Sequence, residues 1–138
     1  SIGFLWLASW LFYLIISFKM EVLQYQEYHD ISVKLAPLLD ALSHPARLQI
    51  LLHLAKYKGC PAWNISNQLP ISKSTVSQHM AKLKEVGLIE CDADGTSQRY
   101  RLSDDGVALL KAYFLDFVGE LEASKGNRGE CCPKNGCC

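Results

Sequence analysis

Between residues 28 and 123, apolar residues recur in short runs at three- and four-residue spacing, and Ser, Pro or Gly stands near the ends of these runs. This spacing is typical of amphipathic helices, and the three residue types are common where helices begin and end. A chain with this pattern folds around an apolar core, which excludes global disorder and collagen-like repeats. The apolar stripe of the first predicted helix is Tyr28, Ile31, Leu35, Leu38, Leu39 and Leu42.

A second and a third helix are expected before residue 71. Ser43 is expected to cap the second helix, with Pro45 in its first turn and Gly59 closing it in a left-handed conformation. Pro61 is expected to open the short third helix and Pro70 to stop it. The apolar residues of the two helices are Leu48, Ile50, Leu51, Leu54 and Ala55, then Trp63, Ile65 and Leu69.

Two longer helices are expected further along the chain. Ser72 is expected to cap a fourth helix that ends at Gly87, and Ser103 a last helix that continues to Ala123. The inward residues of the fourth helix are Val76, Met80 and Leu83. The apolar face of the last helix is Val107, Leu110, Phe114, Phe117, Val118 and Leu121.

Between these helices the pattern changes to two short strands. Residues 88–91 and 98–102 are expected to form a hairpin, with the run Asp92-Ala93-Asp94-Gly95 as its turn. The predicted fold is therefore mainly α with a small β-hairpin. The chain contains no internal repeat, no glycine-rich phosphate loop and no alternating βαβ pattern, so phosphate-handling and dinucleotide chemistry have no visible site.

The 138 residues are enough for one domain with tails. Ile2 to Phe18 form an uncharged apolar run, at the short edge of what a membrane-spanning helix needs. We interpret Met20 as the natural start and residues 1–19 as translated upstream sequence; a membrane anchor and a buried or partner-covered helix are the alternatives. Residues 20–123 are expected to form the folded domain, and residues 124–138 a flexible Cys-rich tail.

Charge is balanced over the whole chain but not along it. There are 14 basic and 14 acidic residues, yet no Asp or Glu lies between Ala41 and Lys84. A local excess of positive charge attracts polyanions by counterion release, although an ordinary solvated face is the alternative. The six basic residues of this stretch are Arg47, Lys56, Lys58, Lys73, Lys82 and Lys84.

The fourth predicted helix carries the side chains that would read DNA. A helix in the major groove needs hydroxyls, amides and cations at its N-terminal end, and a solvated helix would more usually carry Glu and Lys pairs. Arg99 is expected to face the DNA backbone from the hairpin, and His79 to pack beside Val76 and Leu83. The predicted DNA-binding residues of this helix are Ser72, Lys73, Ser74, Thr75, Ser77, Gln78 and Lys82.

Three segments resemble the ArsR/SmtB-type winged-helix transcriptional repressors. They are LLDALSHPARLQILLHLA, ISKSTVSQHMAKLKEVGLIE and DGTSQRYRLSDDG, and the similarity covers about Leu35 to Leu121. The resemblance implies a winged helix-turn-helix, a cytoplasmic homodimer built from the first and last helices, and no enzymatic activity. It also implies that the protein binds operator DNA without metal and releases it when a soft metal or metalloid binds.

The chain departs from the family at its usual metal sites. Family members that sense arsenite or cadmium often carry C-x-C in the third helix, and alignment on the recognition helix puts Pro61 and Trp63 there. Zinc sensors of the family often use His on the last helix, whereas residues 104–122 contain none. The resemblance alone therefore does not make this chain a metal sensor.

Cysteines crowd the end of the chain and suggest another metal site. Vicinal thiolates suit soft ions, and we favour arsenite over other thiophilic ions, while disulfide pairing and a disposable tail are the alternatives. Two other function classes remain open: a repressor that senses oxidants through its thiols, and a membrane-tethered metal-binding protein. The candidate ligands are Cys131, Cys132, Cys137 and Cys138, with Cys60 and Cys91 less favoured.

Overall fold

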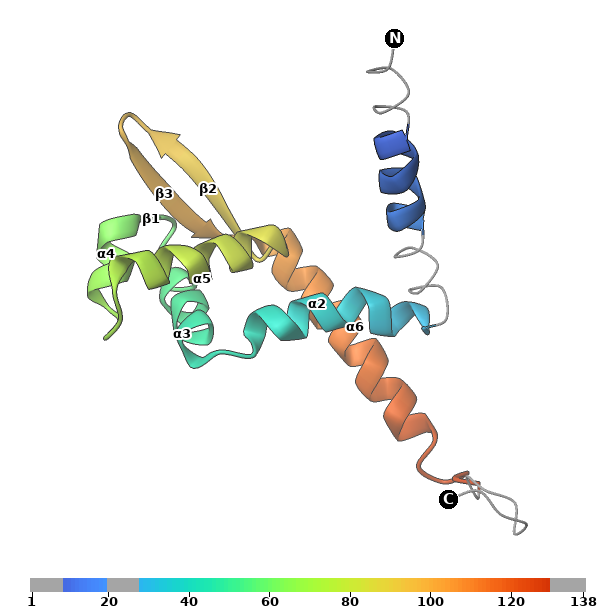
Figure 1. Ribbon diagram of the computed structural model, residues 1–138. Helices are drawn as coiled ribbons and strands as arrows, with labels where there is room; N and C mark the ends of the chain where they lie inside the picture. The colour runs from blue at the N-terminus through green and yellow to red at the C-terminus, as the bar shows by residue number, and fades with distance from the viewer. Residues whose placement is uncertain (1–8, 20–27, 130–138) are drawn as a thin grey trace. The chain divides into compact units, whose positions relative to one another are not determined.

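The computed structural model describes residues 9–19 and 28–129 (Figure 1). The chain divides into two compact units, residues 1–34 and 35–138. In the first unit, residues 9–19 form a helix whose large apolar side chains are exposed. Each helix within the described ranges is too short or too polar to cross a bilayer.

The first two helices of the sequence pattern are α2 (Asp30–Leu42) and α3 (Pro45–Leu54). The cap of α3 is His44 and not Ser43, because the His44 ring accepts from the backbone N–H of Ala46 while the Ser43 hydroxyl donates back to the carbonyl of Asp40. The expected end at Gly59 is also wrong. The helix closes at Ala55 in a right-handed conformation, so no glycine is needed there.

A helix-turn-helix follows. The short helix α4 (Ala62–Asn67) and the long helix α5 (Lys73–Glu85) are both close to their predicted positions. Ser72 caps α5 by accepting from the N–H of Thr75, and Gly87 ends it with a φ of 77°, which a side chain would disfavour. Val76, Met80 and Leu83 are buried, as the apolar spacing predicts.

The sheet is larger than the predicted hairpin. It has three antiparallel strands in the order β1-β3-β2, namely β1 (Cys60–Pro61), β2 (Ile89–Asp94) and β3 (Ser97–Leu102). The predicted turn is misplaced, because Asp94 pairs with Ser97 and the chain reverses at Gly95 and Thr96. Two residues suffice because Gly95 takes a φ of 64°.

The core joins four helices to the sheet, and α6 (Asp104–Ala123) packs on it near its N-terminal end, through Leu110 and Tyr113. Ser103 caps α6 as predicted, by accepting from the N–H of Gly106. This architecture confirms the predicted fold class, mainly α with a small antiparallel sheet. The core residues are Leu38, Ala41, Ile50, Leu54, Cys60, Ile65, Leu69, Val76, Met80, Leu83, Leu88 and Ile89.

Candidate nucleic-acid interface

The N-terminal end of α5 presents polar side chains to solvent. Lys73, Ser74, Ser77 and Gln78 are exposed, whereas Val76 and Met80 on the opposite face lie in the core. The helix is therefore fixed from behind by apolar packing while its outer face is free to enter a groove. Hydroxyl and amide groups at this end of a helix are able to donate to and accept from base edges.

Two predicted DNA-binding residues have a structural role in the cap. The hydroxyl of Ser72 accepts from the N–H of Thr75 at 3.2 Å, and the two hydroxyls lie 2.7 Å apart. Thr75 is also half-buried. The hydroxyl of Ser74 also lies 3.1 Å from that of Ser72, so the exposed hydroxyl and amide side chains outside this cap are those of Ser77 and Gln78.

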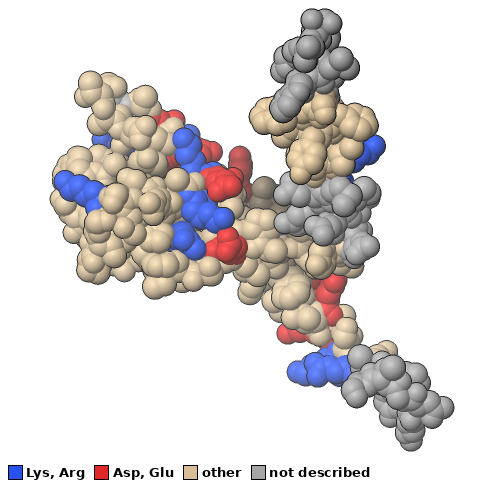
Figure 2. Space-filling model, in the orientation of Figure 1, with Lys and Arg blue, Asp and Glu red and all other residues tan. Residues whose placement is uncertain are grey.

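The cations of α5 differ in their surroundings. Lys82 forms an ion pair with Asp40 of α2 at 3.0 Å, and this contact lowers the pKa of Asp40 and raises that of Lys82. Among the described residues Lys73 makes no ion pair, so its charge is available to a phosphate. Figure 2 shows this contrast on a larger scale, since the basic side chains at the centre of the drawn face lie beside acidic ones.

The positive charge of the hairpin is partly neutralised, because the strand register places acidic residues next to one of its arginines. Arg101 lies opposite Glu90 and forms ion pairs with Glu90 and Asp92, which raise its pKa. Arg99 donates from Nη2 to the carbonyl of Gly59 at 3.1 Å and so ties β3 to the start of β1. The wing therefore offers less free positive charge than its two arginines suggest.

Tyr100, which lies between Arg99 and Arg101 on β3, packs against the core between two cysteines. It pairs in the sheet with Cys60 on one side and Cys91 on the other. Burial raises the pKa of Tyr100, and Cys91 adds to this effect. Cys60 is buried and burial raises the pKa of its thiol, so this sulfur is not a ready thiolate.

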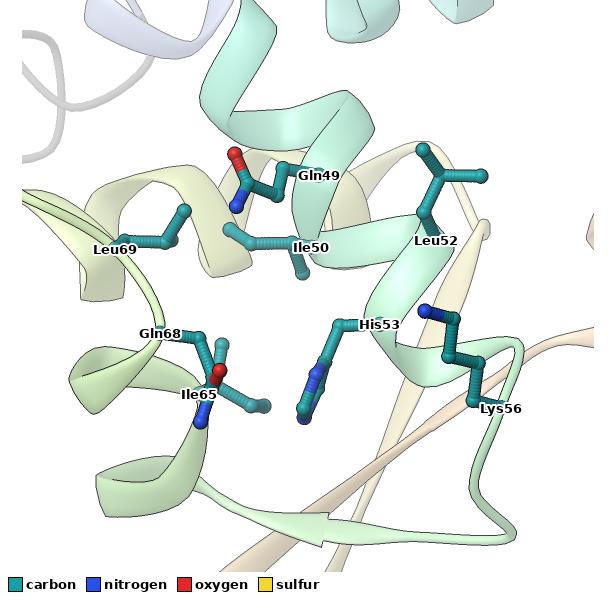
Figure 3. Close-up of a pocket in the computed structure, with 8 residues that line it drawn as sticks. All are labelled: Gln49, Ile50, Leu52, His53, Lys56, Ile65, Gln68 and Leu69. Carbon is teal, nitrogen blue, oxygen red and sulfur yellow. The ribbon is translucent and has the colours of Figure 1, made fainter.

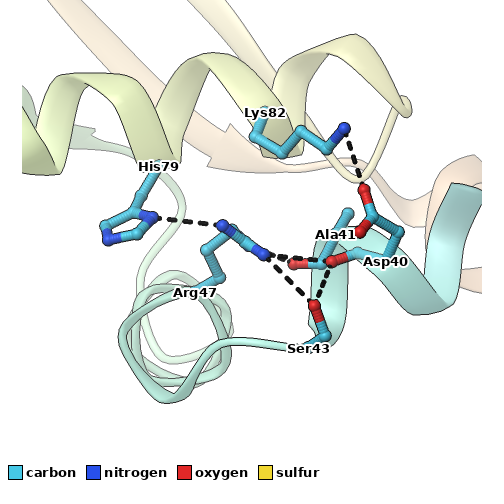
Figure 4. A network of polar contacts seen from close by, with 6 residues as sticks. All are labelled: Asp40, Ala41, Ser43, Arg47, His79 and Lys82. Atoms are coloured by element: carbon cyan, nitrogen blue, oxygen red, sulfur yellow. Dashed lines mark hydrogen bonds and ion pairs between the residues drawn. The ribbon is translucent and has the colours of Figure 1, made fainter.

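A polar cluster behind α5, centred on Arg47, was not predicted from the sequence (Figure 4). From α3, the guanidinium donates to the carbonyls of Ala41 and Asp40 at the end of α2, and Nη1 lies 3.3 Å from Nδ1 of His79 on α5. His79 is buried, as predicted, but beside polar groups, including the ring of His44 at 4.3 Å. Nothing in the local sequence pairs Arg47 with His79, because 32 residues separate them.

A cavity of about 270 Å³ opens between α3 and α4 (Figure 3). Its apolar floor is Ile50, Ile65 and Leu69, and Gln49, Gln68 and Lys56 surround the opening. His53 also lines it, with Nε2 3.1 Å from Oδ1 of Asn64 and 3.6 Å from Sγ of Cys60.

The predicted thiol site falls beyond the part of the chain that the structure describes. Its four residues are Cys131, Cys132, Cys137 and Cys138. Within residues 9–19 and 28–129, no three His, Cys, Asp or Glu side chains are grouped so as to hold a metal ion. The ligand set proposed from the sequence therefore stays a prediction.

The sequence is similar to known transcriptional regulators. Residues 42–92 match the family model described as a helix-turn-helix domain. The HTH-type transcriptional regulator YgaV of Escherichia coli (strain K12) is 36% identical over 77 residues, which are 56% of this chain and 78% of the relative. The transcriptional activator HlyU of Vibrio cholerae is 33% identical over 85 residues, 62% of this chain and 78% of the relative.

Solved structures share the fold. The crystal structure of a possible transcriptional regulator for arsenical resistance superposes with a TM-score of 0.55 at 31% identity, over 67% of this chain and 96% of the other. The homodimeric winged helix-turn-helix domain Mb0332 of Mycobacterium bovis, a solution structure, gives a TM-score of 0.51 at 25% identity, over 75% of this chain and 96% of the other.

Proposed function

Because the chain belongs to the ArsR/SmtB family of winged-helix transcriptional regulators, we propose that it represses an arsenic- or metal-resistance operon and leaves the operator when a thiophilic ion binds its cysteines. The chain is a DNA-binding transcriptional regulator and not an enzyme. The observation that carries the proposal is the exposed hydroxyl and amide face of α5, with its backing in the core. One solved neighbour is a possible regulator for arsenical resistance, which supports arsenic as the signal.

The regulator acts as a cytoplasmic homodimer on double-stranded operator DNA. Two recognition helices must lie about 34–36 Å apart to enter successive major grooves. In this proposal α2 and α6, the first and last helices of the winged-helix domain, form the dimer interface. The homodimeric neighbour supports a dimer.

Thiolate chemistry favours arsenite as the inducer in this proposal. Arsenous acid and three thiols give a pyramidal arsenic trithiolate and three water molecules, and two vicinal cysteines plus a third supply the sulfurs. Soft thiolates select such ions over magnesium or calcium. Capture of the ion by Cys131, Cys132, Cys137 and Cys138 shifts the dimer away from the spacing that DNA requires.

A thiol-redox signal is the second candidate. In that case two thiols of the tail lose two electrons and two protons to a peroxide, and a disulfide and two water molecules form. One solved neighbour is the reduced form of HlyU from Vibrio cholerae, at 31% identity and a TM-score of 0.51, which favours keeping this candidate. Release of DNA by peroxide in the absence of arsenite would identify it.

Membrane tethering is the third candidate and rests on the exposed apolar side chains of residues 9–19. A membrane-tethered metal-binding protein would sediment with membranes and ignore duplex DNA. Fractionation of cells that express the native gene separates this candidate from the regulator.

The deciding experiment is fluorescence anisotropy of the full chain on the duplex upstream of its own gene, with and without arsenite. We expect tight binding without arsenite and release with it. The variant with Cys131, Cys132, Cys137 and Cys138 all changed to Ser should bind DNA and stay bound in arsenite.

The matched control changes Cys60→Ser and Cys91→Ser and leaves the tail intact. This control should still be released by arsenite. Equal release of the tail variant would disprove the tail site while leaving DNA binding standing. No binding to the duplex even at low salt would disprove the regulator itself.

A further inference from the structure

The Arg47 cluster connects the end of one helix to the middle of the recognition helix. The carbonyls of Asp40 and Ala41 are among the last four of α2, which have no partner within a helix. Arg47 donates to both carbonyls, and its remaining nitrogen faces His79 at 3.3 Å. Arg47 lies on α3, and its side chain contacts both the end of α2 and the middle of α5 (Figure 4).

A second link runs parallel to the first. Lys82, one turn beyond His79 on α5, contacts the carboxylate of Asp40 at 3.0 Å. Two successive turns of α5 are therefore held by the same end of α2. A displacement of α2 would act on α5 at His79 and Lys82 together.

The Arg47 contact requires a neutral His79. A guanidinium has only donors, so Nδ1 of His79 must be an acceptor, and the ring proton must lie on Nε2. The charged and titratable groups next to the ring are His44, the N-cap of α3, and Arg47 on α3. Lys82 follows three residues later on α5, and its partner is Asp40 of α2. His44 also caps α3, with Nδ1 accepting from the N–H of Ala46, and its ring lies tilted against that of His79.

We propose that Arg47 is a positioning residue for the recognition helix: it holds α5 through neutral His79, and protonation of His79 releases α5 from its DNA-competent place. This inference rests on the proposed function, because it takes α5 as the helix that enters DNA. It adds a proton as a second signal, read at a site separate from the cysteines.

The direction of the effect follows from where the proton binds. Burial lowers the pKa of His79, and the nearby His44 and Arg47 lower it further. We call the Arg47–His79 contact the clasp. With the clasp closed, His79 binds a proton less readily than in a released state, where the ring faces water and has an ordinary pKa of about 6.5. As the pH falls below about 6.5, the released state gains protons first and is favoured.

This direction is opposite to that of general electrostatics. Acid adds positive charge to a protein and strengthens its contacts with phosphates, so ordinary DNA binding tightens as the pH falls. A fall in operator affinity at mildly acidic pH would therefore be due to the Arg47–His79 contact and not to the overall charge. One proton per subunit allows at most about a tenfold weakening per pH unit for each subunit.

The test is operator affinity between pH 7.5 and pH 6.0 at constant salt. We expect the wild type to weaken several-fold on acidification. His79→Gln keeps an acceptor for Arg47 and cannot titrate, so it should bind at pH 7.5 and show no acid weakening. His53→Gln, a half-buried histidine outside the cluster, should behave as the wild type does.

His44 needs its own variant because its ring lies 4.3 Å from that of His79. His44→Asn keeps a good helix cap and removes the second ring. Acid weakening should persist in this variant. If it disappears here, or if it persists in His79→Gln, His44 or another group is the sensor and the proposal is wrong.

A measurement without DNA separates this inference from the proposed function. The ring nitrogens of His79 are observable by NMR in the full chain. We expect a neutral ring with Nε2 protonated and a titration midpoint below the ordinary histidine value of about 6.5. Arg47→Lys retains a charge but not the planar fork, and should raise the midpoint of His79 and weaken operator binding several-fold. An unchanged midpoint would overturn the clasp even in a protein that binds its operator.

Discussion

Two glycines of α6 occupy opposite environments. A Cβ on Gly106 would lie 2.0 Å from the carbonyl oxygen of Gly87, which is backbone and has little room to move. A Cβ on Gly119 would meet nothing within 4 Å. The start of α6 is thus pressed against the end of α5, and only a residue without a side chain permits this approach.

Exchange of each glycine for alanine should therefore have effects of opposite sign. Gly106→Ala should lower the free energy of unfolding by at least about 3 kcal/mol, since a backbone clash exceeds ordinary overpacking. Gly119→Ala should raise it by about 0.5–1 kcal/mol, because alanine loses less backbone entropy in a helix. Urea denaturation at one fixed protein concentration measures both. Equal effects of the two changes would contradict the packing of α6 on Gly87.

The helix caps show which features can be predicted from the local sequence. Ser72 and Ser103 were predictable because each directly precedes a predicted helix and its hydroxyl accepts from a backbone N–H in the first turn of that helix. Ser43 has the same local signal, but its hydroxyl bonds to the preceding helix and His44 caps α3 instead. In a short connection between two helices, a serine hydroxyl can bond either to the last carbonyls of the preceding helix or to the first N–H groups of the next one. The sequence does not say which of the two it does.

At the scale of elements, the polar residues of α5 have different roles: some contact phosphates or hold the helix in place, and others contact bases. Lys73 is exposed at the N-terminus, Gln78 is exposed one turn later, and Lys82 is occupied by Asp40. A free cation contributes to phosphate attraction at any sequence. An amide contributes to discrimination between bases.

Alanine at Lys73 and at Gln78 should therefore separate affinity from specificity. Gln78→Ala should weaken specific binding by about 1–3 kcal/mol and leave nonspecific binding nearly unchanged. Lys73→Ala should weaken both and lower the slope of log affinity against log salt by about one. Lys82→Ala is the control cation and should change this slope less. The measurement is anisotropy over a salt series with operator and scrambled duplexes. Unchanged operator affinity in Gln78→Ala and Lys73→Ala would show that another helix enters the groove.

The sheet has two features that the periodicity of the sequence does not predict: the position of the turn and the third strand. The residues of the hairpin were predictable from their β-pattern, but the turn was placed too early because Asp92 and Asp94 resemble turn residues. The actual register puts Asp92 opposite Arg99 and Asp94 opposite Ser97, while the carboxylate of Asp92 accepts from the side chain of Arg101. The third strand, Cys60–Pro61, is two residues long and has no periodicity to detect.

At the scale of the whole molecule, the predictable part is the chain of local elements and the unpredictable part is their contacts. The helix order and the family motifs were enough to predict the winged helix. The contact between Arg47 and His79 arises only when α2, α3 and α5 meet. The acid-free stretch likewise overstated the free charge, since Asp40 lies just before it and pairs with Lys82.

The last helix carries an apolar stripe that the rest of the described chain covers only in part, at Leu110. Its residues recur at alternating spacings of three and four, as in the seam between two packed helices. The exposed ones include Phe114 at 45% and Leu121 at 56% of their full accessible surface. A second copy of the chain is the occupant in the proposed homodimer. The stripe consists of Val107, Leu110, Phe114, Phe117 and Leu121.

Phe114→Glu should therefore convert the dimer into a monomer in sedimentation experiments at micromolar concentration. The buried charge would have no partner in an apolar seam, so association costs several kcal/mol more than in the wild type. Operator affinity should fall with it, because one recognition helix contacts a single half-site. Ala112→Glu places the same charge on the opposite, exposed face of α6 and should leave a dimer that binds DNA. A dimeric Phe114→Glu protein would mean that the subunits meet through another face, and a monomer with full operator affinity would separate DNA reading from dimerisation.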